Sequence, residues 1–441
     1  MSLTAMNTQL RFWLNKQLRF SPYFYQKLKA VQQESKLSFS ELECLRNKRF
    51  LKLVNQAYSK SSFYRDLYDQ HGVNLQQIQN TEDIHKLPII TKYDLQAHIT
   101  KMFVGNRFNQ TQAYTSGTSG PPLRVYRDYQ STILEGAYHW RQKISFGHYP
   151  GMKTVVLRAN LHRDKRESYD PFTQSLFLSS YQLSEKNGPW YYEKISQFAP
   201  HAIYAYPSSM ESLANIFSAI GKSVSVPFVF TSSETLYQHQ RSKVERVFNT
   251  CTVDWYGNAE RSIALEQKSD GKYHELPLYS VNEYYDEYTV ATGLINFSLP
   301  LIRYRVDDII SLDKTSPTTA SGCRQIATIQ GRSDDVLLLP DGSRIGMIWG
   351  VFDRIPNLLR AQVIQKQLEK FQVNLVVGPE FGLQDEKLLR TKIAEFIGEQ
   401  ANYTLSYVSD DQIVRAKSGK YKLIINDLLC KEPETSDSVT T

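Results

Sequence analysis

Four short β-rich runs, separated by stretches with helical periodicity, constrain the fold of this 441-residue chain more than any other feature. The runs are Lys153–Leu157, Ala202–Tyr206, Phe228–Thr231 and Thr252–Tyr256. Strands that alternate with helices predict an α/β sheet. Two later runs, Leu294–Phe297 and Asp308–Leu312, are also predicted to be strands. We therefore expect an α/β fold with a large, multi-sheet N-terminal domain.

The pattern changes after Gly331-Arg332. Short strands and one helix are predicted there at Val336–Leu339, Val363–Gln365, Val373–Val377, Glu386–Glu399 and Tyr421–Ile425. This order predicts a small α+β domain over residues 332–430, following a large domain over residues 1–331. Residues 431–441 are polar and rich in Ser and Thr, which predicts a disordered tail.

Charge and cysteine content exclude several classes of protein. The net charge of +7 is mild and suits an anionic small substrate or an anionic membrane surface. No basic run is dense enough for a nucleic-acid groove, so no nucleic-acid partner is expected. The four cysteines have no CxxC spacing, which argues against a zinc knuckle or a disulfide framework. Without a signal-peptide core or a membrane-spanning apolar run, we expect a cytoplasmic protein.

The stretch Leu10–Val31 mixes large apolar residues with five Lys and Arg residues. One interpretation is an amphipathic helix in a membrane interface, which implies peripheral association with the inner membrane. The other is a helix packed on the large domain. Two further helices are predicted at Glu41–Ser59 and Ser61–His71, where apolar residues recur at helical spacing. Leu87–Lys92 is expected to be an extended run that ends at a helix start.

The most informative segment is Thr115-Ser-Gly-Thr-Ser-Gly-Pro-Pro122, which follows a predicted strand at Ala113–Thr115. Gly117 and Gly120 allow a sharp turn that brings backbone N–H groups together as an anion site. The lysine and spacing of a Walker A loop are absent, and so is the GxGxxG order of a dinucleotide fold. A surface turn of small polar residues is the alternative.

Four other motifs follow in a fixed order: Tyr256-Gly-Asn-Ala-Glu260, Pro300-Leu-Ile-Arg-Tyr-Arg-Val-Asp-Asp308, Gly331-Arg-Ser-Asp-Asp335 and Ser418-Gly-Lys420. With the glycine loop, they resemble the ANL superfamily of adenylate-forming enzymes. The resemblance is to the phenylacetate–CoA ligase branch and its CapK-like relatives of capsular polysaccharide biosynthesis. It extends from Leu87 to Lys420 and implies a small C-terminal domain that moves against a large one.

The resemblance assigns the glycine loop to the β- and γ-phosphates of ATP. Its matching residues are Thr115, Ser116, Gly117, Thr118, Ser119 and Gly120. Leu123 stands where many relatives have a lysine, and Arg124 or Arg127 could supply that charge. The alternative is that both arginines are solvated strand residues.

The resemblance also assigns the residues around the adenosine. Tyr256 and Gly257 match the pair that stacks on adenine. Glu260 matches the acid that holds Mg²⁺ against the phosphates, which suits a hard cation that keeps several waters. Asp308 matches the aspartate that accepts both ribose hydroxyls.

Three later residues complete the assignment. Arg332 matches a second ribose or phosphate contact, and Asp334 matches the hinge of the small domain. Lys420 matches the lysine that reaches the α-phosphate and the carboxylate. A cation there would stabilise the charge that develops as the acid attacks phosphorus.

The chain also departs from close phenylacetate ligases, which have a Glu-Cys pair and then a His. Gln267 replaces that cysteine, so a metal site using it is not expected, and His274 becomes a structural or wall residue. Ser232-Ser-Glu234 lacks the GxSxG frame of a nucleophilic serine.

The predicted function is ATP- and Mg²⁺-dependent activation of a carboxylic acid as acyl-AMP, followed by acyl transfer. The acceptor is a thiol, an amine or a sugar, in surface polysaccharide assembly. A phenylacetate–CoA ligase-like enzyme that uses CoA is one alternative, and an inert ATP-binding scaffold is another. Exchange of pyrophosphate with ATP would separate the scaffold from the two enzymes.

Overall fold

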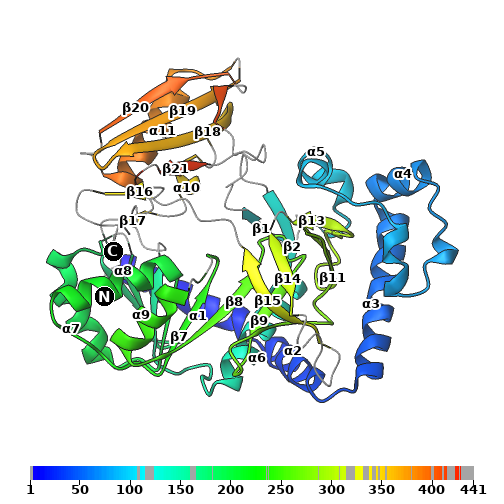
Figure 1. Ribbon diagram of the computed structural model, residues 1–441, viewed down its shortest axis with the longest axis horizontal. Coiled ribbons are helices and arrows are strands. Elements are labelled where there is room, and N and C mark those ends of the chain that lie inside the picture. The colour runs from blue at the N-terminus through cyan, green and yellow to red at the C-terminus, as the bar shows by residue number, and fades with distance from the viewer. Residues whose placement is uncertain are drawn as a thin grey trace, which may run out of the picture.

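The computed structural model describes residues 3–428 apart from 107–109, 115–123, 159–164, 181, 235, 237, 287, 307, 314–322, 331–336, 340–343, 346–347, 353–354, 379, 399–401, 410–411, 415–422 and 427. The described chain is a mixed α/β structure with several sheets (Figure 1). The expected fold class is therefore confirmed. None of the described helices is both long enough and apolar enough to cross a membrane.

A ten-stranded sheet with the order β14-β15-β10-β9-β8-β7-β6-β3-β5-β4 dominates the structure. Its strands are β3 (Thr154–Arg158), β4 (Glu167–Asp170), β5 (Ser175–Ser179), β6 (Ala202–Ala205), β7 (Phe228–Ser232), β8 (Cys251–Gly257), β9 (Ala264–Gln267), β10 (Tyr273–Glu275), β14 (Ile309–Leu312) and β15 (Gln325–Gln330). Strands β5, β3, β6, β7 and β8 are parallel, whereas the pairs from β8 to β14 are antiparallel. The four runs that most constrained the fold are β3, β6, β7 and β8, so these predictions are confirmed.

Helices connect and cover the parallel strands. They are α6 (Tyr129–Ser145), α7 (Gly188–Phe198), α8 (Pro207–Ala219) and α9 (Gln238–Phe248). The core between them and the sheet is fully buried at Val155, Ile203, Phe217, Val229 and Phe248. Burial of both sheet faces explains why these strands read as continuous apolar runs in the sequence.

The N-terminal part is helical. It contains α1 (Leu3–Arg19), α2 (Pro22–Glu34), α3 (Phe39–Lys60), α4 (Ser62–Gln70), α5 (Lys92–Met102) and the 3₁₀ turns η1 (Leu75–Gln77) and η2 (Thr81–Lys86). The predicted helices at 41–59 and 61–71 are confirmed as α3 and α4. Helix α3 begins at a capping box in which Ser38 and Glu41 exchange side-chain and backbone hydrogen bonds. In Figure 1, α3 to α5 lie at the end of the molecule opposite to α7 and α9.

Two smaller sheets lie beside the antiparallel half. One pairs β1 (Gln110–Tyr114) with β2 (Arg124–Asp128), and the other has β11 (Ser280–Tyr284), β12 (Thr289–Gly293) and β13 (Tyr304–Val306). The predicted strand at Leu294–Phe297 is wrong, because β12 ends at Gly293 and no strand follows until β13. Leu294 and Ile295 are buried in the core, so their apolar character marked burial rather than a strand.

The C-terminal elements form a separate four-stranded sheet with the order β20-β19-β18-β21. Its strands are β18 (Leu358–Gln367), β19 (Lys370–Val377), β20 (Asn402–Tyr407) and β21 (Ile424–Asn426), with α10 (Trp349–Phe352), α11 (Leu383–Ile397), β16 (Leu337–Leu338) and β17 (Arg344–Ile345) nearby. The described residues of its hydrophobic core lie between 337 and 424. The elements expected after residue 336 are thus confirmed where described, and β20 is an addition that the sequence did not predict.

Candidate active site

The candidate site begins where β8 ends, at Gly257. Ligands of open α/β sheets bind at the carboxyl ends of parallel strands, and β8 is the last parallel strand before the antiparallel half. Two non-glycine residues here have positive φ, Ser233 after β7 (76°) and Arg261 after β8 (59°). Such conformations cost energy and tend to collect at functional sites. This edge of the sheet is therefore the first place to look for bound substrate.

The first contact joins two residues that the sequence assigned to adenosine. The Tyr256 hydroxyl donates a hydrogen bond of 2.7 Å to Asp308 Oδ2. Tyr256 is half-buried at the end of β8, and Asp308 is half-buried just before β14. Because β8 and β14 are not neighbours in the sheet, this bond brings together two distant segments.

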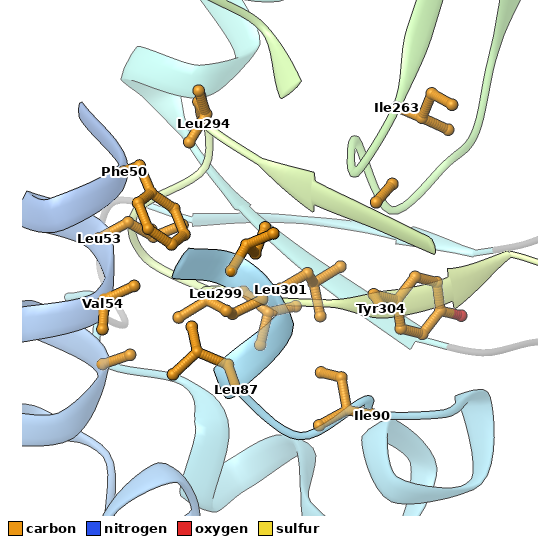
Figure 2. Packing of buried hydrophobic residues seen from close by; sticks show 14 of the residues in the cluster. Phe50, Leu53, Val54, Leu87, Ile90, Ile263, Leu294, Leu299, Leu301 and Tyr304 are labelled. Atoms are coloured by element: carbon orange, nitrogen blue, oxygen red, sulfur yellow. The ribbon is translucent and has the colours of Figure 1, made fainter. Parts of the chain in front are cut away.

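The second contact involves the predicted metal-binding acid. The Tyr304 hydroxyl donates to Glu260 Oε1 at 3.1 Å, and both residues are buried. Figure 2 shows Tyr304 at the edge of a hydrophobic cluster, with its hydroxyl oxygen directed away from Leu301 and Ile90. The ring is thus fixed by packing while its oxygen reaches the acid. We call Tyr256, Glu260, Tyr304 and Asp308 the Tyr–acid cluster.

Strand β13, which carries Tyr304, is anchored by its neighbour Arg303. The Arg303 guanidinium bonds both carboxylate oxygens of Glu283, at 2.9 and 2.7 Å, and donates to the Leu87 carbonyl oxygen at 2.5 Å. Ile90 N donates to the Arg303 carbonyl at 3.0 Å. The segment at 87–92, predicted to be extended and to end at a helix start, therefore holds β13 and leads into α5.

The turn that carries Glu260 is tightly bonded. Ser262 N donates to Asn258 Oδ1 at 3.0 Å, and Asn258 Nδ2 donates back to Ser262 Oγ at 2.7 Å. Arg261 forms an ion pair with Glu135 of α6. Burial alone would raise the pKa of Glu135, but the positive charges of Arg261, His139 and Arg127 and the hydrogen bond from Tyr279 together outweigh it and hold that pKa below its ordinary value. A charged pair thus fixes the turn to α6.

Arg127 extends this anchoring to β2. Its Nε donates to the Ala259 carbonyl oxygen at 3.0 Å. Arg127 is half-buried, so the interpretation of a solvated strand residue is wrong for it, whereas Arg124 is exposed as that interpretation expected. The strand that follows the predicted phosphate loop is therefore tied to the turn of Glu260.

Asp254, two residues before Tyr256 on β8, is a buried carboxylate that the sequence analysis did not select. The Tyr273 hydroxyl donates to its Oδ2 at 2.6 Å, and the Thr231 hydroxyl bonds its other oxygen. Burial raises the pKa of Asp254 to about 6, against the hydrogen bonds that favour its charged form. The sequence signal that could have identified Asp254 is an acidic residue within an apolar run predicted to be a strand.

Gln267, which replaces the cysteine of close phenylacetate ligases, has a structural place in the same region. Its Oε1 accepts from Asp254 N at 2.9 Å and from Arg241 Nη2 at 2.8 Å. His274 is buried with Nε2 2.8 Å from Asp270 Oδ2. Both side chains thus make hydrogen bonds within the fold, and His274 is a buried residue of β10.

The protein ligands available at this site suit a metal ion that is coordinated mainly by the phosphates of a bound nucleotide. In the described part of the chain, no group of three or more His, Cys, Asp or Glu residues could hold an ion by itself. Glu260 offers a single carboxylate, and Mg²⁺ commonly takes one or two carboxylates with phosphate oxygens and waters. The site thus fits Mg²⁺ bound together with ATP rather than a protein-only metal centre.

Of the site residues predicted from the sequence, the structure gathers Tyr256, Glu260 and Asp308 at one edge of the large sheet. Gly257 is exposed beside them, and a Cβ there would lie 3.1 Å from Trp255 Nε1. The other predicted site residues lie outside the described residues: Thr115, Ser116, Gly117, Thr118, Ser119, Gly120, Arg332, Asp334 and Lys420.

Sequence comparison finds relatives over almost the whole chain. Protein CapK of Staphylococcus aureus is 21% identical over 430 residues, which cover 93% of this chain and 94% of that protein. Phenylacetate-coenzyme A ligase of Thermus thermophilus is 24% identical, covering 88% and 96%. The corresponding ligase of Aromatoleum evansii is 26% identical, covering 69% and 73%. Residues 337–427 match the CapK C-terminal domain family.

Structure comparison finds the same architecture. A crystal structure of 2-hydroxyisobutyryl-CoA ligase with 2-HIB-AMP and CoA superposes with a TM-score of 0.57 at 16% identity, covering 88% of this chain and 90% of that one. The chain thus has the fold of the adenylate-forming ligases of the ANL superfamily, as the motifs predicted. The relatives found by sequence include protein CapK and phenylacetate-coenzyme A ligases, and those found by structure include 2-hydroxyisobutyryl-CoA ligase in a postadenylation state.

Proposed function

We propose that this chain activates a carboxylic acid with ATP and passes the acyl group to a nucleophile. In the first step a carboxylate oxygen attacks the α-phosphorus, the bond from that phosphorus to the bridging oxygen breaks, and acyl-AMP and pyrophosphate form. In the second step a thiol, amine or sugar group attacks the acyl carbon, AMP leaves, and the proton of the nucleophile passes to solvent.

The observation that carries the proposal is the Tyr–acid cluster. Tyr256, Glu260 and Asp308, which the motifs relate to adenine, metal and ribose, span 52 residues of the sequence. The Tyr256 hydroxyl bonds Asp308, and the Tyr304 hydroxyl bonds Glu260. The Tyr256 ring beside the Asp308 carboxylate suits a nucleoside, whose base would stack while its ribose hydroxyls donate to the acid. Asp308 would thus fix the nucleotide, and the 2.7 Å bond from Tyr256 orients that carboxylate.

Glu260 would hold Mg²⁺, which supplies positive charge against the phosphates when bound. Its partner Tyr304 keeps the carboxylate in place, and the Arg127 bond to Ala259 stiffens the same turn. Residues Thr115 to Gly120 would donate to the β- and γ-phosphates, and Arg332 would add a ribose or phosphate contact. Fixed donors of this kind favour a transition state in which charge spreads over phosphate oxygens.

We further propose that residues 332–430 form a small domain that turns between the two steps, with Asp334 as its hinge. The self-contained core at 337–424 supports this, because a unit with its own core can rotate without unpacking. Asp334→Pro should slow acyl transfer at least about tenfold more than acyl-AMP formation, since proline fixes φ at the hinge. Equal damage to both steps would count against this hinge.

The identity of the group that accepts the acyl chain is the more specific part of the proposal. The similarity to phenylacetate-coenzyme A ligases and to a ligase crystallised with CoA supports CoA thiol as acceptor. An amine or sugar acceptor in surface polysaccharide assembly is the alternative that the resemblance of the motifs to CapK-like proteins implies.

Hydroxylamine trapping tests the proposal directly. The full chain is incubated with ATP, Mg²⁺ and single acids from a panel of aryl, alkyl and amino acids, and hydroxamate is measured. One acid class should yield hydroxamate, and CoA or amino sugars added in place of hydroxylamine should then identify the acceptor by product mass. Bound ATP without hydroxamate for any acid would favour an inert ATP-binding scaffold.

A further inference from the structure

The outer face of α1 carries a stripe of large apolar side chains at the surface. Leu10, Trp13, Leu14 and Leu18 are 53%, 44%, 46% and 56% exposed. Spacings of three, four and eight residues place them on one side of an α-helix. Single exposed apolar residues are ordinary, but four on successive turns form a patch of the kind that marks an interaction site.

The opposite side of α1 is packed on the protein. Phe12 is buried, and its ring stacks on Phe177 of β5 with centroids 6.3 Å apart and an interplanar angle of 4°. At the end of the helix, the Tyr129 hydroxyl donates to the Leu18 carbonyl at 3.0 Å and lies 3.1 Å from Ser21 Oγ. The stripe therefore faces outward because the inner face is already occupied.

The apolar residues of the next helix, α2, are buried, so the exposed apolar stripe is confined to α1. Phe24, Leu28 and Val31 of α2 are buried against α6, so the apolar residues of α2 serve the core. Of the two sequence interpretations for residues 10–31, packing is thus confirmed for α2. The stripe of α1 needs another explanation.

The basic residues around the apolar stripe indicate what kind of surface it contacts. Residues 1–33 contain Arg11, Lys16, Arg19, Lys27 and Lys29 but no Asp or Glu. At 100° per residue, Arg11 and Lys16 lie on opposite flanks of the apolar stripe. Apolar residues including Trp, bordered by basic residues, are typical of helices that lie in an anionic membrane interface. A second copy would instead oppose these basic residues to those of its partner, which is unfavourable.

We propose that α1 docks this protein on an anionic phospholipid surface, with Trp13 and the three leucines in the interface and the basic residues at the headgroups. One helix with four apolar residues gives weak, reversible binding that depends on anionic lipid and on ionic strength. The docking is independent of the proposed ligase activity, because no residue of the Tyr–acid cluster takes part.

Vesicle flotation of the full chain tests this docking. Vesicles of phosphatidylcholine alone are compared with vesicles that contain about one-third phosphatidylglycerol, at about 0.05 M and about 0.5 M salt. The variant Trp13→Gln/Leu14→Gln removes the centre of the stripe. Its matched control is Leu383→Gln/Leu388→Gln on α11, whose leucines are 87% and 40% exposed beside Asp385 and Glu386.

The wild type and the α11 control should float with the anionic vesicles at low salt, and high salt should release them. The α1 variant should bind at least about tenfold more weakly. Retained far-ultraviolet circular dichroism would establish that it folds. Binding that is equal for neutral vesicles, absent for both compositions or unchanged in the α1 variant would overturn the proposal. A dimer in light scattering that the α1 variant abolishes, without vesicle binding, would assign the stripe to a second copy instead.

Discussion

The Tyr–acid cluster and the C-terminal sheet are built in opposite ways. The cluster takes its four side chains from β8 and the turn after it, from β13 and from the residue just before β14, and each is bonded to a residue of another segment. The C-terminal sheet is formed from one stretch of the chain, and the core residues described for it lie between 337 and 424. Figure 1 shows that sheet set apart from the strands of the cluster.

This difference indicates which role each region would have in the proposed reaction. A cluster fixed by many long-range contacts suits a binding position that must not move. A unit with its own core suits a part that changes position as a rigid body. Under the proposed function, the large sheet holds the nucleotide, and the small sheet brings a catalytic lysine to it.

The largest expected effect belongs to the C-terminal side of the comparison. Lys420→Ala should lower the rate of acyl-AMP formation by about two to three orders of magnitude, because it removes a cation from the developing phosphate charge. ATP affinity should change far less, since the Tyr–acid cluster remains. Rapid-quench measurement of acyl-AMP checks the rate, and transfer from synthetic acyl-AMP should stay near the wild-type rate. A comparable loss in transfer would show that Lys420 does not act in adenylation alone.

The next largest effect is expected at Asp254 and concerns the pH dependence of stability. Because the folded-state pKa of Asp254 is raised from 3.8 to about 6, its contribution to stability is full below about pH 4 and is lost as pH rises through 6. Asp254→Asn removes this titration, so the stability of the variant relative to wild type should rise by up to about 3 kcal/mol between pH 4 and pH 7.

Urea denaturation of both proteins across that pH range measures the difference. Asp313→Asn is a useful control, because Asp313 forms a partly exposed ion pair with Lys272 at 2.8 Å. A difference between Asp254→Asn and wild type that stays constant with pH would contradict a protonated, buried Asp254.

Asp308→Ala tests the proposed nucleotide-binding role of the Tyr–acid cluster. Loss of charge-assisted bonds worth about 1.5–3 kcal/mol each should weaken ATP binding at least about tenfold. The control Asp286→Ala removes an exposed aspartate from the β11–β12 connection and should leave affinity unchanged. Calorimetric titration with ATP and Mg²⁺ gives both values. Equal affinity in the two variants would remove Asp308 from the nucleotide site.

The smallest effect is expected for Tyr256→Phe. The ring that would stack on adenine stays, but the 2.7 Å bond to Asp308 is lost. A single such bond contributes about 1 kcal/mol, so ATP affinity should fall about three- to tenfold. Tyr273→Phe, which loses a bond to Asp254 instead, should affect stability more than affinity. The reverse order of the two variants in ATP titration would argue against Tyr256 as the nucleotide contact.

Sequence patterns predicted the parallel half of the large sheet because its strands are apolar on both faces and separated by helices. They failed at Leu294–Phe297, where an apolar run is buried without joining a ladder. Motif order predicted Tyr256, Glu260 and Asp308 as members of one site. The bonds of Arg127 to Ala259 and of Tyr273 to Asp254 depend on segments that meet only in the folded chain, so local sequence carried no signal for them.

Exchange of labelled pyrophosphate into ATP tests the central claim most directly, because it requires reversible formation of acyl-AMP and needs no acceptor. With the acid found by hydroxylamine trapping, the wild-type chain should catalyse exchange that depends on both the acid and Mg²⁺, and Asp308→Ala should reduce it. Intact ATP binding without acid-dependent exchange in the wild type would contradict the assignment of this chain as an adenylate-forming ligase.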